Sequence, residues 1–86
     1  MSTLLVFISV NVFKNMKYYF SIKITTNEFL PYYQGTIQNV VVTTTQGVKV
    51  QFPAMHLRKY LTVNGIQGDF CLQTQQNKFL SISKLN

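Results

Sequence analysis

The chain has 86 residues, which is enough for one domain built around a single hydrophobic core. Apolar residues make up 47% of it and aromatic residues 14%, a composition that is ample for a packed core and argues against an intrinsically disordered chain. Eight Lys and Arg residues face only two acidic residues, so the formal net charge at pH 7 is +6. This charge favours anionic partners such as nucleic acids, nucleotides or membrane headgroups, although many small proteins are basic merely for solubility.

Residues 1–15 form the most apolar part of the chain. Apolar, mostly β-branched residues recur at every second position from Leu4 to Val12, a pattern typical of a strand. The segment is shorter than the roughly 20 apolar residues of a membrane-spanning helix, and it lacks the features of a secretory signal. Two interpretations stay open: an extra strand that must pair with something, or an extension, produced by start-site choice, ahead of a domain that begins at Met16.

The segment KYYFSIKIT, residues 17–25, alternates between two faces and predicts a half-buried strand. Thr25 and Glu28 then have the spacing of a capping box, in which each side chain bonds a free backbone N–H at a helix start. Pro31 would disturb a longer helix. We therefore expect a short helix or two tight turns that end at Gly35. On the strand itself, the predicted inner face holds Tyr18, Phe20, Ile22 and Ile24, and the outer face holds Tyr19, Ser21 and Lys23.

Residues 36–52 predict a β-hairpin. Its first arm is rich in Val and Thr, and Gln46-Gly47 supplies a turn residue that accepts a positive φ. In the second arm Val48, Val50 and Phe52 share one face, while Lys49 and Gln51 share the other. Pro53 has no N–H to donate, so the ladder should end there.

A short basic helix is expected over about residues 54–61, because Leu57, Tyr60 and Leu61 recur at helical spacing. Asn64-Gly65 ends it, and Gly68 allows a second tight bend. The segments DFCLQT and KFLSISKL then predict a last hairpin around QQN. In that hairpin Phe70 and Leu72 are expected to face Leu80 and Ile82, and Cys71, the single cysteine, is expected to be a strand residue in a reduced protein.

Five short antiparallel strands with helical turns at the corners predict a mainly β protein, specifically a small, closed or half-closed β-barrel. An SH3-like barrel is the first choice, with an OB-like or six-stranded variant as alternatives. Residues 16–86 would form this single domain, and residues 1–15 would supply the sixth strand if they are used.

Several motifs resemble a family of short gammaproteobacterial proteins that is catalogued as a domain of unknown function. The motifs are YYQG, GVKVQFPA, LRKY and GIQGDF, and the resemblance extends over residues 16–86. It implies a bacterial, cytoplasmic, single-domain protein. It implies no activity, because none is established for the family.

Enzymatic chemistry lacks the necessary side chains. Glu28 and Asp69 are the only carboxylates and lie in separate predicted elements, so they cannot form an acid–base pair. With His56 and Cys71 they are also the only metal-ligating candidates, and the four are widely spaced. No glycine pattern indicates a phosphate-binding loop. We therefore expect no enzyme, no metal and no small-molecule cofactor.

Nucleic-acid binding fits the composition better, with RNA or single-stranded DNA as partner. Small β-barrels present a face where bases stack on aromatic rings beside a basic groove. Without sequence readout the expected affinity is weak, with a Kd of about 10⁻⁴–10⁻⁶ M. Each ring also has a simpler interpretation as core or rim packing. The candidates are Tyr19, Tyr32, Tyr33 and Tyr60 for stacking, and Lys23, Lys49, Arg58 and Lys59 for phosphate contacts.

The alternative is a protein–protein interaction module, including a homodimer paired through edge strands. The apolar segment 1–15, the strand-rich chain and the many uncharged polar residues favour it, because exposed strand edges pair with other chains.

Overall fold

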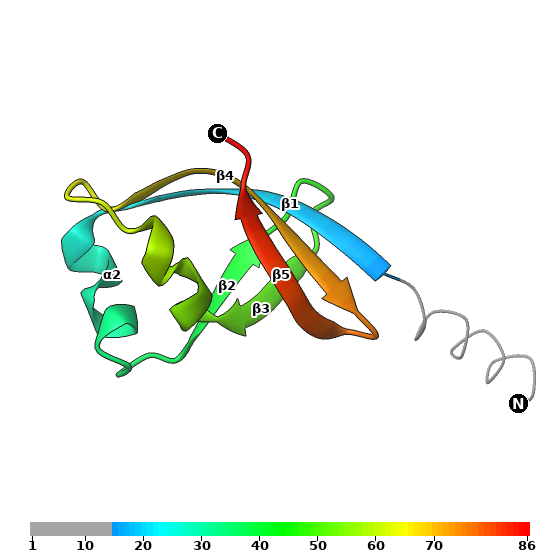
Figure 1. Cartoon of the computed structure of the whole chain (residues 1–86), viewed down its shortest axis with the longest axis horizontal. Helices are drawn as coiled ribbons and strands as arrows, with labels where there is room; N and C mark the ends of the chain where they lie inside the picture. Colours follow the sequence, from blue (N-terminus) through cyan, green and yellow to red (C-terminus); the bar gives the residue numbers. More distant parts are fainter. Residues whose placement is uncertain (1–14) are drawn as a thin grey trace, which may run out of the picture.

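Five strands in two antiparallel sheets and two short helices make up the computed structural model, which describes residues 15–86 (Figure 1). The prediction of a mainly β fold is confirmed. The segment 1–15 lies outside the described residues except for Asn15, which begins the first strand. No helix in the described part of the chain is long and apolar enough to cross a membrane. The elements are β1 (Asn15–Ile24), α2 (Thr26–Tyr33), β2 (Asn39–Thr43), β3 (Lys49–Pro53), the 3₁₀ helix η1 (Ala54–Tyr60), β4 (Ile66–Gln75) and β5 (Lys78–Lys84).

The larger sheet has the strand order β1-β4-β5 and the smaller one is the β2–β3 hairpin. β1 pairs with β4 along its whole length, from Asn15 opposite Gln75 to Ile24 opposite Ile66. Its two faces are as predicted, because Phe20 is buried while Tyr19 and the other outer-face residues are exposed. The β2–β3 hairpin turns at Gly47, whose φ is +81°, and Pro53 is the last residue of β3.

Helix α2 begins with the predicted capping box. The Thr25 hydroxyl accepts a hydrogen bond from the Glu28 N–H at 3.1 Å, and the Thr25 N–H donates to the Glu28 carboxylate at 2.8 Å. Pro31 lies inside the helix, where it cannot donate a backbone hydrogen bond to the preceding turn, and the helix ends at Tyr33. Gly35 follows with a φ of +85°, as expected for the residue that closes a short helix.

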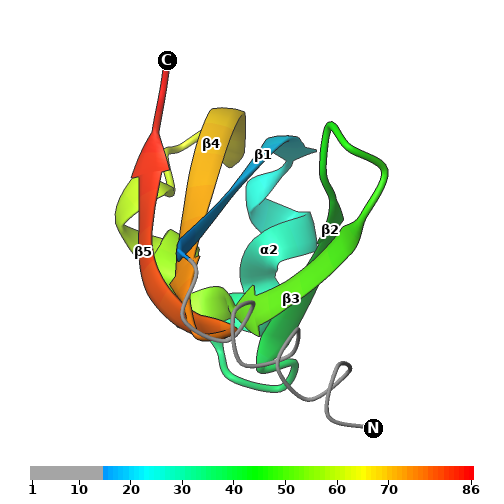
Figure 2. The ribbon, with the colours of Figure 1, turned by 90° about the vertical axis from the view of Figure 1, so that its right-hand side faces the viewer.

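The predicted barrel is not closed within residues 15–86. The Thr45 N–H donates to the Tyr19 carbonyl at 2.8 Å, and this is the one backbone hydrogen bond between β1 and the hairpin in the described part of the chain. From that point β1 and β2 diverge toward α2 (Figure 1). Seen from the side, α2 lies between the two sheets (Figure 2). Phe29 of α2 is buried in the core and lines the gap between β1 and β2, so the helix keeps the two strands apart.

The short helix predicted after Pro53 is present as a 3₁₀ helix that ends at Tyr60. Two local predictions need correction. Gly68 lies within β4 instead of at a bend. Leu80 does not face the core: a β-bulge between Gln73 and Thr74 shifts the register, so Leu72 faces Ile82 while Leu80 is 47% exposed.

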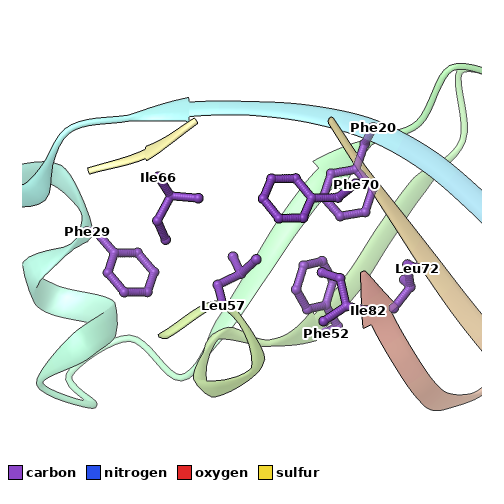
Figure 3. Close-up of a cluster of buried hydrophobic side chains, with 8 residues drawn as sticks. All are labelled: Phe20, Phe29, Phe52, Leu57, Ile66, Phe70, Leu72 and Ile82. Carbon is purple, nitrogen blue, oxygen red and sulfur yellow. The ribbon is translucent and has the colours of Figure 1, made fainter. Parts of the chain in front are cut away.

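The core lies between the two sheets and is completed by one residue from each helix (Figure 3). Phe20 stacks on Phe70 with ring centres 5.8 Å apart, and Phe52 of the hairpin lies 5.8 Å from Phe20. The Phe20–Phe52 contact joins the two sheets through side chains, whereas β1 and the hairpin share a single backbone hydrogen bond in the described part of the chain. The buried core cluster consists of Phe20, Phe29, Phe52, Leu57, Ile66, Phe70, Leu72 and Ile82.

Candidate functional site

Four of the eight predicted site residues come together at η1. Ala54 and Leu57 of this helix are buried, so Arg58 and Lys59 in its last turn are left at the surface. Arg58 Nη2 donates a hydrogen bond of 2.6 Å to the Tyr33 carbonyl, at the end of α2. The guanidinium carbon lies 5.0 Å from the centre of the Tyr33 ring, which is a cation–π distance. Arg58 therefore ties η1 to the carbonyl end of α2 and lies over an exposed aromatic ring.

Lys59 and Tyr60 form the second part of this surface. The Lys59 ammonium lies 5.2 Å from the centre of the Tyr60 ring. That ring is half-buried: it packs edge-on against Phe70 at 5.2 Å, and its hydroxyl donates to the Ile82 carbonyl at 3.2 Å. Tyr60 therefore anchors η1 to the core, while Lys59 faces solvent above it.

Of the other four predicted site residues, only Tyr32 reaches this group, because it lines a groove together with Arg58. Tyr32 is half-buried and stacks on Phe29 with a ring distance of 5.8 Å. Tyr19 and Lys23 are exposed on the outer face of β1, and Lys49 is the first residue of β3. Within residues 15–86, no hydrogen bond or aromatic contact connects Tyr19, Lys23 or Lys49 to η1. The cations consequently form separate groups.

His56 and Phe79 also belong to the surface around η1, although the sequence did not predict either of them as a nucleic-acid-binding residue. Their rings are stacked at 3.7 Å with an angle of 9° between the planes, and this joins η1 to β5. The sequence pattern could not predict this contact, because the inward position of Phe79 depends on the bulge that shifts the register of β5.

Two shallow grooves run along the sides of η1. The one toward α2 has a volume of about 320 Å³, and the one toward β5 has a volume of about 340 Å³. Met55 and Arg58 form the ridge between them and contribute to both. No acidic side chain lines either groove. We call the surface formed by Tyr33, Met55, His56, Arg58, Lys59 and Phe79 the η1 corner.

Both acidic side chains are engaged elsewhere. On the outer face of β4, the Asp69 carboxylate accepts hydrogen bonds from the Ser21 hydroxyl and from Asn86 Nδ2. These two bonds, the one from Ser21 first, lower the pKa of Asp69 below its ordinary value of 3.8. The pKa of Glu28 is lowered below 4.5 by the hydrogen bonds from the Thr25 backbone and side chain. The described residues contain no group of three or more potential metal ligands.

These two lowered pKa values predict how stability depends on pH. Each carboxylate stabilises the folded state above its unfolded pKa, and that stabilisation is lost as the pH falls through the lower folded value. The free energy of unfolding, measured by urea titration between about pH 5.5 and pH 3, should therefore decrease in the parent chain. In the double variant Glu28→Gln/Asp69→Asn the decrease should be much smaller, because the chain has no other Asp or Glu. An equal decrease in both proteins would show that these two carboxylates do not cause the loss of stability at low pH.

Comparison with known proteins agrees with the resemblance seen in the sequence motifs. The model of a family described as "Protein of unknown function (DUF2835)" matches residues 16–85, which is most of the chain. No curated protein and no solved structure matches the chain. The bacterial source that the resemblance implied stays a prediction. By its match over the β1–β5 domain, the chain belongs to the DUF2835 family of proteins of unknown function.

Proposed function

We propose that the protein is a non-enzymatic binding module that holds a single-stranded nucleic acid at the η1 corner. The observation that carries the proposal is Arg58 placed over the exposed ring of Tyr33, beside Lys59 and between two grooves without acidic residues. A cytoplasmic location and a relation of this open two-sheet fold to SH3-like or OB-like barrels belong to the same proposal.

The corner combines the two kinds of group that single-stranded nucleic acids need. Arg58 and Lys59 supply positive charge for phosphates, and Tyr33, a residue that is 47% exposed, supplies an aromatic ring. Base stacking on such a ring does not depend on sequence, because every base has a flat π-face. The stacked pair His56–Phe79 adds a second flat surface on the other side of η1.

The electrostatics support an anionic ligand. The formal charge of the chain is +6, and both carboxylates are exposed but hydrogen-bonded at other places. With no acid along either groove, a polyanion bound at the corner meets no local repulsion. The arrangement offers positive charge and stacking surfaces but no nucleophile, base or metal ligand set, so we propose binding without chemistry.

Single substitutions test the proposal. A labelled oligothymidylate or oligouridylate of about 20 nucleotides is titrated with the full chain while fluorescence anisotropy is followed. Two phosphate contacts predict a slope of about −1.4 for log K against log salt. Tyr33→Ala should weaken binding about 5- to 150-fold, because a stacked base contributes about 1–3 kcal/mol. Lys59→Glu should also weaken it and reduce the slope.

Matched controls come from the outer face of β1. Tyr19 is 40% exposed, close to the 47% of Tyr33, and Lys17 is an exposed lysine on the same face. Tyr19→Ala and Lys17→Glu should leave the dissociation constant unchanged within about twofold, since neither residue touches η1. The proposal fails if no binding occurs at low salt. It also fails if Lys17→Glu weakens binding as much as Lys59→Glu while Tyr33→Ala has no effect, which would indicate attraction by net charge alone.

A further inference from the structure

Strands β1 and β2 turn unpaired backbone edges toward each other. The Tyr19 carbonyl accepts its hydrogen bond from Thr45, so it points away from β4. Backbone groups alternate in direction along a strand, and the N–H and C=O of one residue point to the same side. The backbone groups of Ser21 and Lys23 therefore also point away from β4 and toward β2.

The backbone groups of β2 also alternate between the β3 side and the β1 side. The Thr44 N–H donates to the Val48 carbonyl at 2.8 Å, which places the backbone of Thr44 on the β3 side. The residues at odd positions of β2, Asn39, Val41 and Thr43, therefore direct their N–H and C=O groups toward β1. Within residues 15–86 these groups of both strands have no backbone partner beyond the Thr45–Tyr19 bond.

An apolar crevice lies between the two edges. It has a volume of about 420 Å³ and is open to the surface. Ile22 and Ile24 of β1 line one wall, and Val40 and Val42 of β2 line the other. Phe29 of α2 contributes to it as well, the same side chain that keeps the strands apart. An extended peptide in this crevice would find backbone partners on both sides and an apolar surface for every second side chain.

Charge identifies the chemistry of the occupant. Lys23 is exposed on the outer face of β1, between two residues that line the crevice, and Lys49 of β3 is paired with Thr43, which also lines it. A second copy of the chain also carries a formal charge of +6, and residues 1–14 contain no Asp or Glu. Glu28 and Asp69 are both held in hydrogen bonds of their own. Neither a second copy nor residues 1–14 therefore offer the negative charge that complements this rim.

We propose that the crevice between β1 and β2 binds an extended, acidic segment of a different protein by strand addition. The unpaired positions of β2 run from Asn39 to Thr43, so the inserted strand is about five residues long. Its apolar side chains alternate with acidic ones: the apolar ones enter the crevice beside Ile22 and Val42, and the acidic ones lie outside, near Lys23.

The probe is a capped hexapeptide of alternating Asp and Val residues, added to the full-length, isotope-labelled chain. Amide hydrogen exchange, followed by NMR, should be slow at Ser21, Lys23, Val41 and Thr43 only when the peptide is present. The amide of Ile22 points toward β4 and should not change. The same peptide with N-methyl groups on alternate residues cannot donate to both edges, and it should bind at least about tenfold more weakly.

Two charge reversals on one strand face complete the test. Lys23→Glu should weaken binding of the acidic peptide, whereas Lys17→Glu should not, because Lys17 lies beyond the Thr45–Tyr19 bond, outside the crevice. The same variants separate this proposal from the proposed function, since oligonucleotide binding should depend on Lys59 and on neither β1 lysine.

Several results would overturn the proposal. Exchange that is slowed only around η1 would place the peptide at the other surface, and an absence of binding would remove the crevice as a docking site. Amides of Ser21 and Val41 that are already protected without peptide would show that the chain fills its own crevice. Protection that rises with protein concentration would show that a second copy does so.

Discussion

Replacing Gly65 with alanine should prevent the chain from folding. Gly65 has a φ of +99°, in the left-handed region that L side chains avoid, and a Cβ at this position would lie 2.0 Å from the Ile24 carbonyl oxygen. The backbone of Thr25 would lie 2.8 Å away. Neither neighbour can move easily, because Ile24 is paired with Ile66 and Thr25 caps α2. The expected loss exceeds about 5 kcal/mol, comparable with the whole stability of a small domain.

Gly35→Ala is the matched control. Gly35 also has a positive φ, +85°, but nothing lies within 4 Å of the position that its Cβ would occupy. Only the conformational cost remains, about 1–2 kcal/mol. Urea denaturation followed by circular dichroism should therefore give a cooperative transition for Gly35→Ala at reduced urea concentration, and no folded baseline for Gly65→Ala. Similar midpoints for the two variants would show that the Ile24 and Thr25 backbone does not approach Gly65 closely enough to exclude a side chain.

Signals that are local in sequence predicted local structure well. The alternation over residues 17–25 depends only on the two-residue repeat of a strand, and both faces of β1 are as expected. The capping box of Thr25 and Glu28 joins residues three apart, so its geometry follows from the helix start itself. The turn at Gly47 likewise needs only one residue with a positive φ.

Features that depend on distant segments could not be predicted. The barrel stays open at the β1–β2 edge because α2 places Phe29 between the sheets, and no pattern in either strand contains that information. The bulge near Thr74 moves Leu80 outward and brings Phe79 against His56. Arg58 meets Tyr33 only because η1 lies beside the end of α2. The residue types of the candidate site were thus visible in the sequence, but their grouping was not.

Helix α2 links the two proposed binding surfaces. Its buried residue, Phe29, holds β1 and β2 apart and so leaves the crevice accessible. Its last residue, Tyr33, receives the hydrogen bond of Arg58 and offers the ring of the η1 corner. The crevice presents unpaired backbone and an apolar wall, whereas the corner presents cations and flat rings. A module with both surfaces could hold a nucleic acid and an acidic protein segment at the same time.

Phe70→Ala should have the second largest effect on stability. The Phe70 ring has no exposed surface, stacks on Phe20 at 5.8 Å and receives the edge of Tyr60 at 5.2 Å. Truncation of a buried Phe costs about 3–5 kcal/mol, from lost burial and from the cavity that remains. A domain of this size has a stability near the lower end of about 5–15 kcal/mol, so most of its stability would be lost.

The same substitution tests whether the η1 corner depends on the core. Tyr60 joins η1 to Phe70, so loss of the Phe70 ring removes one of the contacts that hold η1 in place. At urea concentrations below its unfolding transition, the Phe70→Ala chain should bind the oligonucleotide more weakly than the parent chain. Val63→Ala is the control: Val63 is 93% exposed, and its truncation should change the free energy of unfolding by less than about 0.5 kcal/mol. A loss below about 1 kcal/mol for Phe70→Ala would mean that this ring is not a central part of the hydrophobic core.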